Sequence, residues 1–126
     1  MDKLVYPELS YRIMGILFKV YNEMGYGYKE KHYQRAIAKL LRREGINFKE
    51  QLRVDIRAEK MHIGHYFMDF VIEGKIVLEI KVSPKFSRKD ILQVLRYLKE
   101  TGMNLGILAA FSRIELIYKR ILRGLN

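Results

Sequence analysis

The segment spanning residues 76–82, IVLEIKV, sets two charged side chains into an otherwise apolar run. Side chains of a β-strand alternate between two faces, so Glu79 and Lys81 would share one face while the other face is entirely apolar. A run of this kind is typical of a strand in the middle of a sheet. Because buried charges are costly unless they are paired or bind a metal ion, the segment predicts either a Glu79–Lys81 ion pair on a half-exposed face or a functional site.

A further charge stands alone in the preceding apolar segment, residues 65–72, where Asp69 is the only formally charged residue. The sequence Glu73-Gly74-Lys75 between the two segments is typical of a hairpin turn. Pairing of the two strands would place Asp69 across from the Glu79 region on one face of the sheet. The alternative is a single buried aspartate whose carboxylate accepts hydrogen bonds from backbone donors.

The rest of the chain predicts an α/β fold. Helical spacing of apolar residues marks three segments, residues 7–24, 29–44 and 87–101. Pro7 suits a first helical turn, Ser87 with Asp90 forms a capping-box pattern at the start of the third helix, and Gly102 is expected to end that helix. Strands are expected at residues 48–58, 65–72, 76–82 and 104–111, with residues 115–122 forming a final strand or a short helix. The predicted order is α-α-β-β-β-α-β, a sheet with helices on its faces.

Glu30 is another unusual carboxylate, because it heads the apolar stripe of the second helix. The stripe consists of Tyr33, Ile37, Leu40 and Leu41. We therefore expect Glu30 to point to the buried side of this helix. The helix dipole favours a glutamate in a first turn, which explains why Glu30 is tolerated there but not why it would face inward.

The charge of the chain favours a polyanionic partner. Lys and Arg number 24 against 14 Asp and Glu, a formal net charge of +10 on 126 residues. An excess of this size on a small domain usually indicates nucleic acid. The alternative is a basic protein whose charge serves solubility only.

Composition also limits the chemistry and the location. Cysteine is absent, which excludes thiolate catalysis and zinc–thiolate sites and leaves any metal ion to carboxylates or histidines. His32, His62 and His65 have no spacing typical of metal ligands, so we interpret them as structural or surface residues. No apolar run approaches the roughly twenty residues of a membrane span, and the N-terminus lacks a signal peptide's apolar region. We expect a single domain over residues 1–126, without a membrane partner, in the cytoplasm.

Asp69 followed by Glu79-Ile80-Lys81 resembles the (P)D…(D/E)xK signature of the PD-(D/E)XK nuclease superfamily, with Met68 in place of the proline. Residues 27–33, GYKEKHY, match the pattern that names the GxxExxY family, a branch of that superfamily. Residues 93–97, QVLRY, resemble the QxxxY motif of its RecB-like and lambda-exonuclease-like branches. The resemblance covers residues 24–119 and implies the superfamily's core, a mixed central sheet flanked by helices.

The resemblance also implies a role for each site residue. Asp69, Glu79 and the backbone carbonyl of Ile80 would bind a hard cation, Mg²⁺ or Mn²⁺, and Glu30 would bind it directly or through water. The cation would activate a water molecule, and Lys81 would orient or help deprotonate that water or offset charge at the phosphate. The implied reaction is hydrolysis of phosphodiester bonds.

Several residues around these motifs are candidates for binding the nucleic-acid backbone. The basic candidates are Lys29, Lys31, Lys85, Arg88 and Lys89. They are equally consistent with solvated helix ends. Gln93 and Tyr97 lie about opposite the apolar stripe of Ile91, Leu95 and Leu98. If that stripe packs on the sheet, the pair projects toward a partner or the edge of the cleft.

Three functions fit these observations. The first is a metal-dependent nuclease acting on DNA, and cutting both strands of a duplex would then favour a homodimer at this size. The second is a nucleic-acid-binding module on the same fold with weak or no catalysis. The third is a basic protein-interaction domain, for which the set of Glu30, Asp69, Glu79 and Lys81 would be coincidence.

Overall fold

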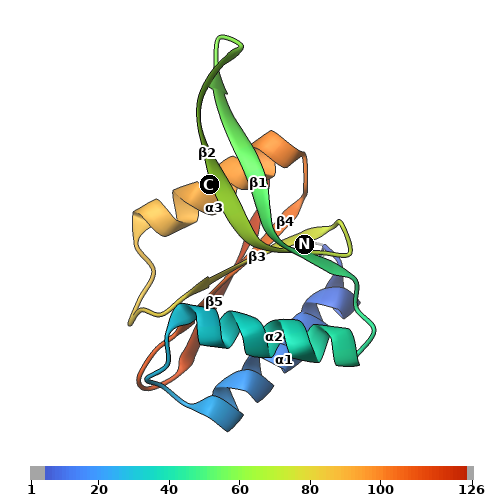
Figure 1. The fold of residues 1–126 in the computed structure, drawn as a ribbon, viewed down its shortest axis with the longest axis vertical. Helices are drawn as coiled ribbons and strands as arrows, with labels where there is room; N and C mark the ends of the chain where they lie inside the picture. Colours follow the sequence, from blue (N-terminus) through green and yellow to red (C-terminus); the bar gives the residue numbers. More distant parts are fainter. Residues whose placement is uncertain (1–4, 125–126) are drawn as a thin grey trace, which may run out of the picture.

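The computed structural model describes residues 5–124 and contains three helices and five strands there (Figure 1). They are α1 (Pro7–Met24), α2 (Glu30–Arg43), β1 (Phe48–Ala58), β2 (Met61–Ile72), β3 (Ile76–Lys81), α3 (Arg88–Thr101), β4 (Leu105–Phe111) and β5 (Leu116–Leu122). This confirms the predicted order and resolves the last segment as a strand. No helix among the described residues is long and apolar enough to cross a bilayer.

The five strands form one mixed sheet in the order β1-β2-β3-β4-β5. Neighbouring strands are antiparallel except β3 and β4, which pair in parallel from Ile76↔Leu105 to Lys81↔Ala110. Parallel neighbours need a long crossover connection, and α3 supplies it. β3 therefore lies in the middle of the sheet, as its apolar run predicted.

Helices cover the sheet on both faces. Ile76, Leu78 and Ile80 of β3 pack in one core with the buried residues of α1 and α2. Val77 of β3 packs in a second core with Val94 and other buried residues of α3. Glu79 and Lys81 alternate with the first set, so they belong to the face on which α3 packs.

The two ends of α3 follow the pattern predicted from the sequence. Ser87 and Asp90 form a reciprocal capping box, in which the Asp90 amide donates to Ser87 Oγ at 3.1 Å and the Ser87 amide donates to Asp90 Oδ2 at 3.0 Å. Gly102 ends the helix with φ of 76°, a left-handed conformation that glycine adopts without strain. The capping box fixes the start of α3 beside the end of β3.

β2 pairs with β3 only along its last three residues and separates from it before Phe70. Only residues 70–72 of β2 pair with β3, whereas β2 as a whole pairs with β1 from Ile72 back to Met61. The strand therefore begins four residues before the predicted start at His65. Residues 53–67 form a two-stranded ribbon that projects beyond the rest of the molecule (Figure 1). Its two-residue turn, Glu59 and Lys60, has positive φ at both positions, as type I′ hairpins require.

Candidate active site

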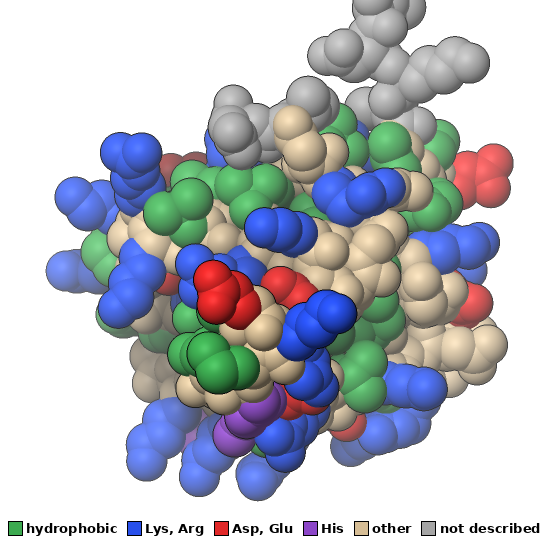
Figure 2. Space-filling model, turned by 90° about the horizontal axis from the view of Figure 1, so that it is seen from above, with side chains coloured by type: hydrophobic (Ala, Val, Ile, Leu, Met, Phe, Trp, Pro, Cys, Tyr) green, Lys and Arg blue, Asp and Glu red, His purple; other side chains and the backbone are tan. Residues whose placement is uncertain are grey.

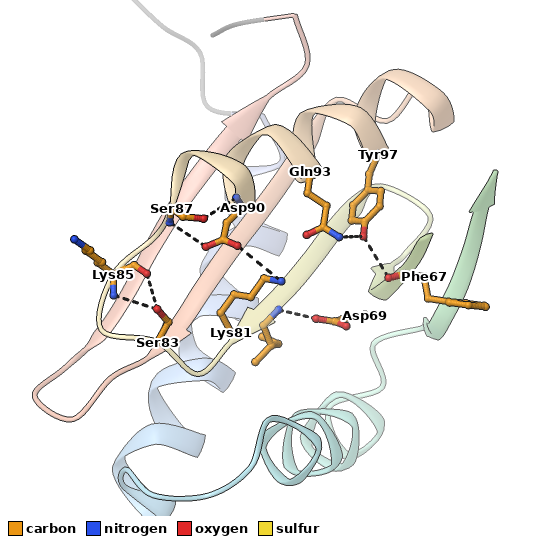
Figure 3. A network of polar contacts seen from close by, with 10 residues as sticks. Phe67, Asp69, Lys81, Ser83, Lys85, Ser87, Asp90, Gln93 and Tyr97 are labelled. Atoms are coloured by element: carbon orange, nitrogen blue, oxygen red, sulfur yellow. Dashed lines mark hydrogen bonds and ion pairs between the residues drawn. The ribbon is translucent and has the colours of Figure 1, made fainter. Parts of the chain in front are cut away.

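Two carboxylates meet where β2 and β3 separate. One step beyond the last pair, Phe70↔Leu78, the register places Asp69 opposite Glu79. At this position, hydrogen bonds from backbone amides to the two carboxylates take the place of the backbone–backbone hydrogen bonds between β2 and β3. The Asp69 amide donates to Glu79 Oε2 at 2.7 Å. The Ile80 amide donates to Asp69 Oδ2 at 2.8 Å, the bond drawn to the Asp69 carboxylate in Figure 3. The structure thus brings Asp69, Glu79 and the Ile80 backbone together through a reciprocal pair of hydrogen bonds.

Burial makes this pair of carboxylates electrostatically unfavourable when both are ionised. Glu79 is 3% exposed, and burial raises its pKa to about 8, with the charge of Asp69 adding to the increase. Burial also raises the pKa of Asp69, although the hydrogen bond from the Ile80 amide acts in the opposite direction. A nearby cation would relieve both effects, because it stabilises the charged form of each carboxyl group.

Lys81 supplies one positive charge to this region without forming the Glu79 ion pair that the sequence allowed. Its charge lowers the pKa of both Asp69 and Glu79. Its ion-pair contact among the described residues is with Asp90, at 4.0 Å between Nζ and Oδ1 (Figure 3). Asp90 therefore both caps α3 and holds Lys81 at the site. The sequence indicated only the capping role.

Glu30 lies at the first residue of α2, where the structure corrects one expectation. Tyr33, Ile37 and Leu41 of the stripe are fully buried, but Glu30 is exposed. Burial of the stripe begins at Tyr33, about one turn into the helix, because the first turn of α2 lies outside the core. The carboxyl group of Glu30 is nevertheless partly shielded, and its pKa is raised by burial and by the charge of Asp69. Glu30 thus stands at the exposed rim of the same site.

The expected outward direction of Tyr97 is wrong. Tyr97 is fully buried, and it packs on the sheet with Val94 and Leu98. Its hydroxyl accepts a hydrogen bond from Gln93 Nε2 at 2.8 Å and donates to the Phe67 carbonyl at 3.4 Å (Figure 3). Tyrosine can be buried here because its polar tip finds partners. The ring is consequently unavailable as a surface contact for nucleic acid.

The hydroxyl of Tyr97 nevertheless belongs to the surroundings of the carboxylates. Its pKa is raised by burial first and then by the charges of Glu79 and Asp69. Gln93, half-buried, reaches the same hydroxyl from one turn earlier in α3. The pair thus anchors the β2 backbone at Phe67, two residues before Asp69.

The five basic candidates for phosphate contacts are all exposed. Lys29 and Lys31 flank Glu30 at the start of α2, and Lys85, Arg88 and Lys89 surround the start of α3. Lys89 and Lys81 help line a cavity of about 480 Å³ beside the site. Its other lining residues are Tyr66, Asp90, Leu92, Gln93 and Arg96.

The histidines take structural or surface positions. Nδ1 of His32 accepts a hydrogen bond from the Lys29 amide at 3.3 Å, inside the first turn of α2. His62 and His65 are exposed on the ribbon.

Gln51 is a site residue that the sequence did not indicate. It lies in β1 opposite Asp69 by register, and its side-chain amide lowers the pKa of the Asp69 carboxyl group. Its φ of 50° is unusual for a residue other than glycine and is costly in a strand. Only the register of β1 on β2 identifies this position, and no spacing along the chain marks it.

The donor set at the site fits a hard divalent cation. Among residues 5–124, no three Asp, Glu, His or Cys side chains stand close enough to form a ready-made metal cluster. In Asp69 and in Glu79, however, one carboxylate oxygen accepts a hydrogen bond from a backbone amide, and the second oxygen takes no part in these two bonds. Two carboxylates with raised pKa values, supplemented by backbone and water oxygens, suit Mg²⁺ or Mn²⁺.

Two solved structures are similar to this chain in fold. The solved structure of the protein SSO0001 is similar to this chain with a TM-score of 0.60 and 17% identity, covering 96% of this chain and 62% of that one. An alkaline exonuclease (LHK-Exo) from Laribacter hongkongensis has a TM-score of 0.52 and 14% identity, covering 98% of this chain and 72% of that one. At these identities the likeness shows the fold, and this chain spans less than two thirds of the length of SSO0001.

Sequence comparison identifies the family. No curated protein matches the chain in its sequence. The family model described as PD-(D/E)XK nuclease superfamily matches residues 7–121, nearly the whole sequence and all of the elements that build the site. The chain therefore belongs to the PD-(D/E)XK nuclease superfamily.

Proposed function

We propose that this chain hydrolyses phosphodiester bonds of nucleic acid, with DNA as the main substrate, and that it requires Mg²⁺ or Mn²⁺. The observation that carries the proposal is the pair Asp69 and Glu79 at the separation of β2 and β3. Both carboxyl groups have raised pKa values, and neither forms an ion pair within 4.0 Å among the described residues. Ionising two such buried carboxyl groups lowers the stability of the metal-free fold, whereas a bound cation would stabilise both charges.

Asp69, Glu79 and the backbone carbonyl of Ile80 would hold the cation, and Glu30 would contribute directly or through water. When bound, the cation supplies Lewis-acid stabilisation of the phosphate and lowers the pKa of a bound water. Lys81 would orient that water or offset negative charge at the phosphate, and its contact with Asp90 would keep Nζ in place. The exposed Lys29, Lys31, Lys85, Arg88 and Lys89 would hold neighbouring phosphates, as would Gln93 from the cavity beside the site.

Membership of a nuclease superfamily and the likeness to an alkaline exonuclease support nuclease activity. The net charge of +10 supports a nucleic-acid partner. A binding module with weak catalysis is the second candidate, and the observation favouring it is that no three potential metal-ligand side chains lie together in the described part of the chain. The two candidates differ in cleavage and not in binding.

We also propose that the chain belongs to the GxxExxY branch. The three named residues of that pattern have distinct positions here. Gly27 has φ of 114° before α2, Glu30 begins the helix at the rim of the site, and Tyr33 stacks on Phe111 with ring centroids 4.2 Å apart. A single domain over residues 1–126, a homodimer and a cytoplasmic location stay predictions from the sequence.

A cleavage assay tests the proposed function. Single-stranded and duplex DNA and RNA are incubated with wild-type protein in Mg²⁺, in Mn²⁺ and in EDTA. We expect cleavage in either cation and none in EDTA. Asp69→Ala should abolish cleavage while binding largely persists, and Glu115→Ala, which removes an exposed carboxylate from the turn before β5, should cleave as wild type does. Binding without cleavage in any cation would favour the binding module.

A further inference from the structure

Three aromatic rings follow one another along the outer face of the ribbon. The His62 and His65 rings are stacked with centroids 6.3 Å apart, and the His65 and Phe67 rings meet edge to face at 5.3 Å. All three residues are exposed, and Phe67 is 48% exposed. We refer to His62, His65 and Phe67 as the ring ladder.

The ring ladder leads to the carboxylates. Asp69 follows Phe67 by two residues in the same strand, so Phe67 is the ring of the ladder nearest to the carboxylates along β2. The opposite face of the ribbon is occupied, because Val54 and Met68 are buried against α3 and the Tyr66 hydroxyl accepts a hydrogen bond from Arg96 at 3.1 Å. The ring ladder is thus the free face of an arm whose other face is anchored.

Two arginines stand across the ribbon from the rings. Arg53 pairs with Phe67 and Arg57 pairs with His62 in the register of β1 on β2. Asp55 holds both guanidinium groups, at 3.0 Å from Arg53 Nε and 3.8 Å from Arg57 Nη2. Figure 2, which views the end toward which the ribbon projects, shows histidine side chains at the surface among Lys and Arg. Positive charge and exposed rings are therefore combined on one surface.

The spacing of the ring ladder selects the form of nucleic acid that it fits. The ring centroids of the ladder are 6.3 Å and 5.3 Å apart, whereas bases in one strand of B-form DNA rise by about 3.4 Å. The stacked bases of a duplex are too closely spaced for each base to contact its own ring. Bases in an extended, unpaired strand can be far enough apart to do so. Exposed rings interleaved with arginines are the usual means of holding unpaired bases.

We propose that the ring ladder is a stacking platform for the bases of single-stranded nucleic acid, which it guides toward Asp69 and Glu79. This inference rests on the proposed action on nucleic acid and names its substrate as a strand with an unpaired stretch. Phe67 is the ring next to the site, so it holds the base closest to the bond that is cut. Arg53 and Arg57 contact the backbone of the same strand.

Binding measured in EDTA tests the ring ladder separately from cleavage. The probes are a fluorescent oligothymidylate and an abasic strand of the same length, which has the backbone but no bases. Wild-type protein should bind the oligothymidylate more tightly. Phe67→Leu, which keeps an apolar side chain but removes the ring, should weaken oligothymidylate binding by about tenfold and leave abasic binding unchanged. Phe67→Trp should retain wild-type affinity for both.

Tyr11→Leu is the matched control, because it removes a ring that is 82% exposed on α1. It should change neither affinity. Equal affinities of wild-type protein for the two strands, or full oligothymidylate binding by Phe67→Leu, would overturn the proposal. So would preferential binding of a duplex that is insensitive to Phe67→Leu. If the protein cleaves DNA in Mg²⁺ while Phe67→Leu binds normally, only the ring ladder fails, and if the ring dependence is seen without any cleavage, only the nuclease assignment fails.

Discussion

The two parts of β2 on either side of Asp69 belong to one continuous strand, but one is buried and the other is largely exposed. Residues 70–72 lie between β1 and β3 and are buried on both faces, with Phe70 fully buried. Residues 61–67 pair only with β1, and most of their side chains are exposed, including Phe67. Residues 70–72 hold the sheet together, and residues 61–67 extend away from it.

The difference teaches where a sheet can accommodate a polar site. Asp69 lies next to Phe70, where the pairing of β2 with β3 stops. Its carboxylate accepts a hydrogen bond from the Ile80 amide, in place of the backbone carbonyl that a paired strand would provide. Backbone groups in the middle of a sheet must otherwise be paired with each other. Where β2 and β3 separate, the backbone amides of Asp69 and Ile80 lose their partners in the sheet. The carboxylates of Glu79 and Asp69 accept the hydrogen bonds of these two amides.

The comparison should be clearest in two phenylalanine substitutions, which give the largest expected difference in stability. Phe70→Ala should lower the free energy of unfolding by about 3–5 kcal/mol, because it leaves a cavity in a closed core. Phe67→Ala should lower it by less than about 1 kcal/mol, because the ring is half exposed. Urea denaturation of both variants measures the two values. Similar losses would show that the ribbon is part of the core.

The pH dependence of stability should distinguish the site from the rest of the strand. Burial raises the pKa of Glu79 from 4.5 to about 8 in the folded protein. The folded state therefore holds this proton more tightly than the unfolded state, and the stability it confers is complete below about pH 4.5 and is lost as the pH rises toward 8. We expect the metal-free protein to become progressively less stable across this window.

Glu79→Gln should remove most of that dependence, since the amide does not titrate. The matched control is Glu50→Gln, which alters an exposed glutamate opposite Phe70 in β1 and should leave the pH dependence of wild type. Chemical denaturation in EDTA at a series of pH values gives the comparison. Stability that rises between these pH values in wild type would mean that Glu79 is not destabilised by burial.

Two tyrosine hydroxyls provide the smallest and most local comparison. Tyr97→Phe removes a hydrogen bond to the Phe67 carbonyl beside the site, and Tyr21→Phe removes one to the Ser112 carbonyl, where the distance is 2.7 Å. Each should cost about 1 kcal/mol of stability. Only Tyr97→Phe should also slow cleavage, because only that hydroxyl anchors the β2 backbone at Phe67, two residues before Asp69. Equal cleavage rates for both variants would remove Tyr97 from the surroundings of the site.

The parts of the fold that local chemistry determines could be predicted from the sequence. The start of α3 follows from the side chains of Ser87 and Asp90, and its end follows from Gly102. The central position of β3 follows from its apolar run. The closeness of Asp69 to Glu79 was expected because a short turn fixes the register of the two strands. Each of these predictions needs only neighbours within about ten residues in the chain.

The parts that depend on distant partners could not be predicted. The burial of Tyr97 depends on Gln93 and on the Phe67 carbonyl, and the latter lies 30 residues away in the sequence. Two stripes of α3 are apolar enough to face the sheet, and the hydrogen bonds of Tyr97 favour the one that contains it. The role of Gln51 depends on how β1 pairs with β2. The full length of the ribbon likewise follows from pairing, because its sequence has little apolar alternation.

Thermal unfolding with and without Mg²⁺ tests most directly whether Asp69 and Glu79 form a cation site. A ligand raises the melting temperature only of a protein whose folded state binds it. We predict that Mg²⁺ raises the Tm of wild type by several degrees, that Asp69→Asn is as stable as wild type or slightly more stable in EDTA, and that Mg²⁺ leaves the Tm of Asp69→Asn unchanged. A clearly destabilised Asp69→Asn, together with a wild type that Mg²⁺ does not stabilise, would make Asp69 a structural residue and would contradict the proposed site.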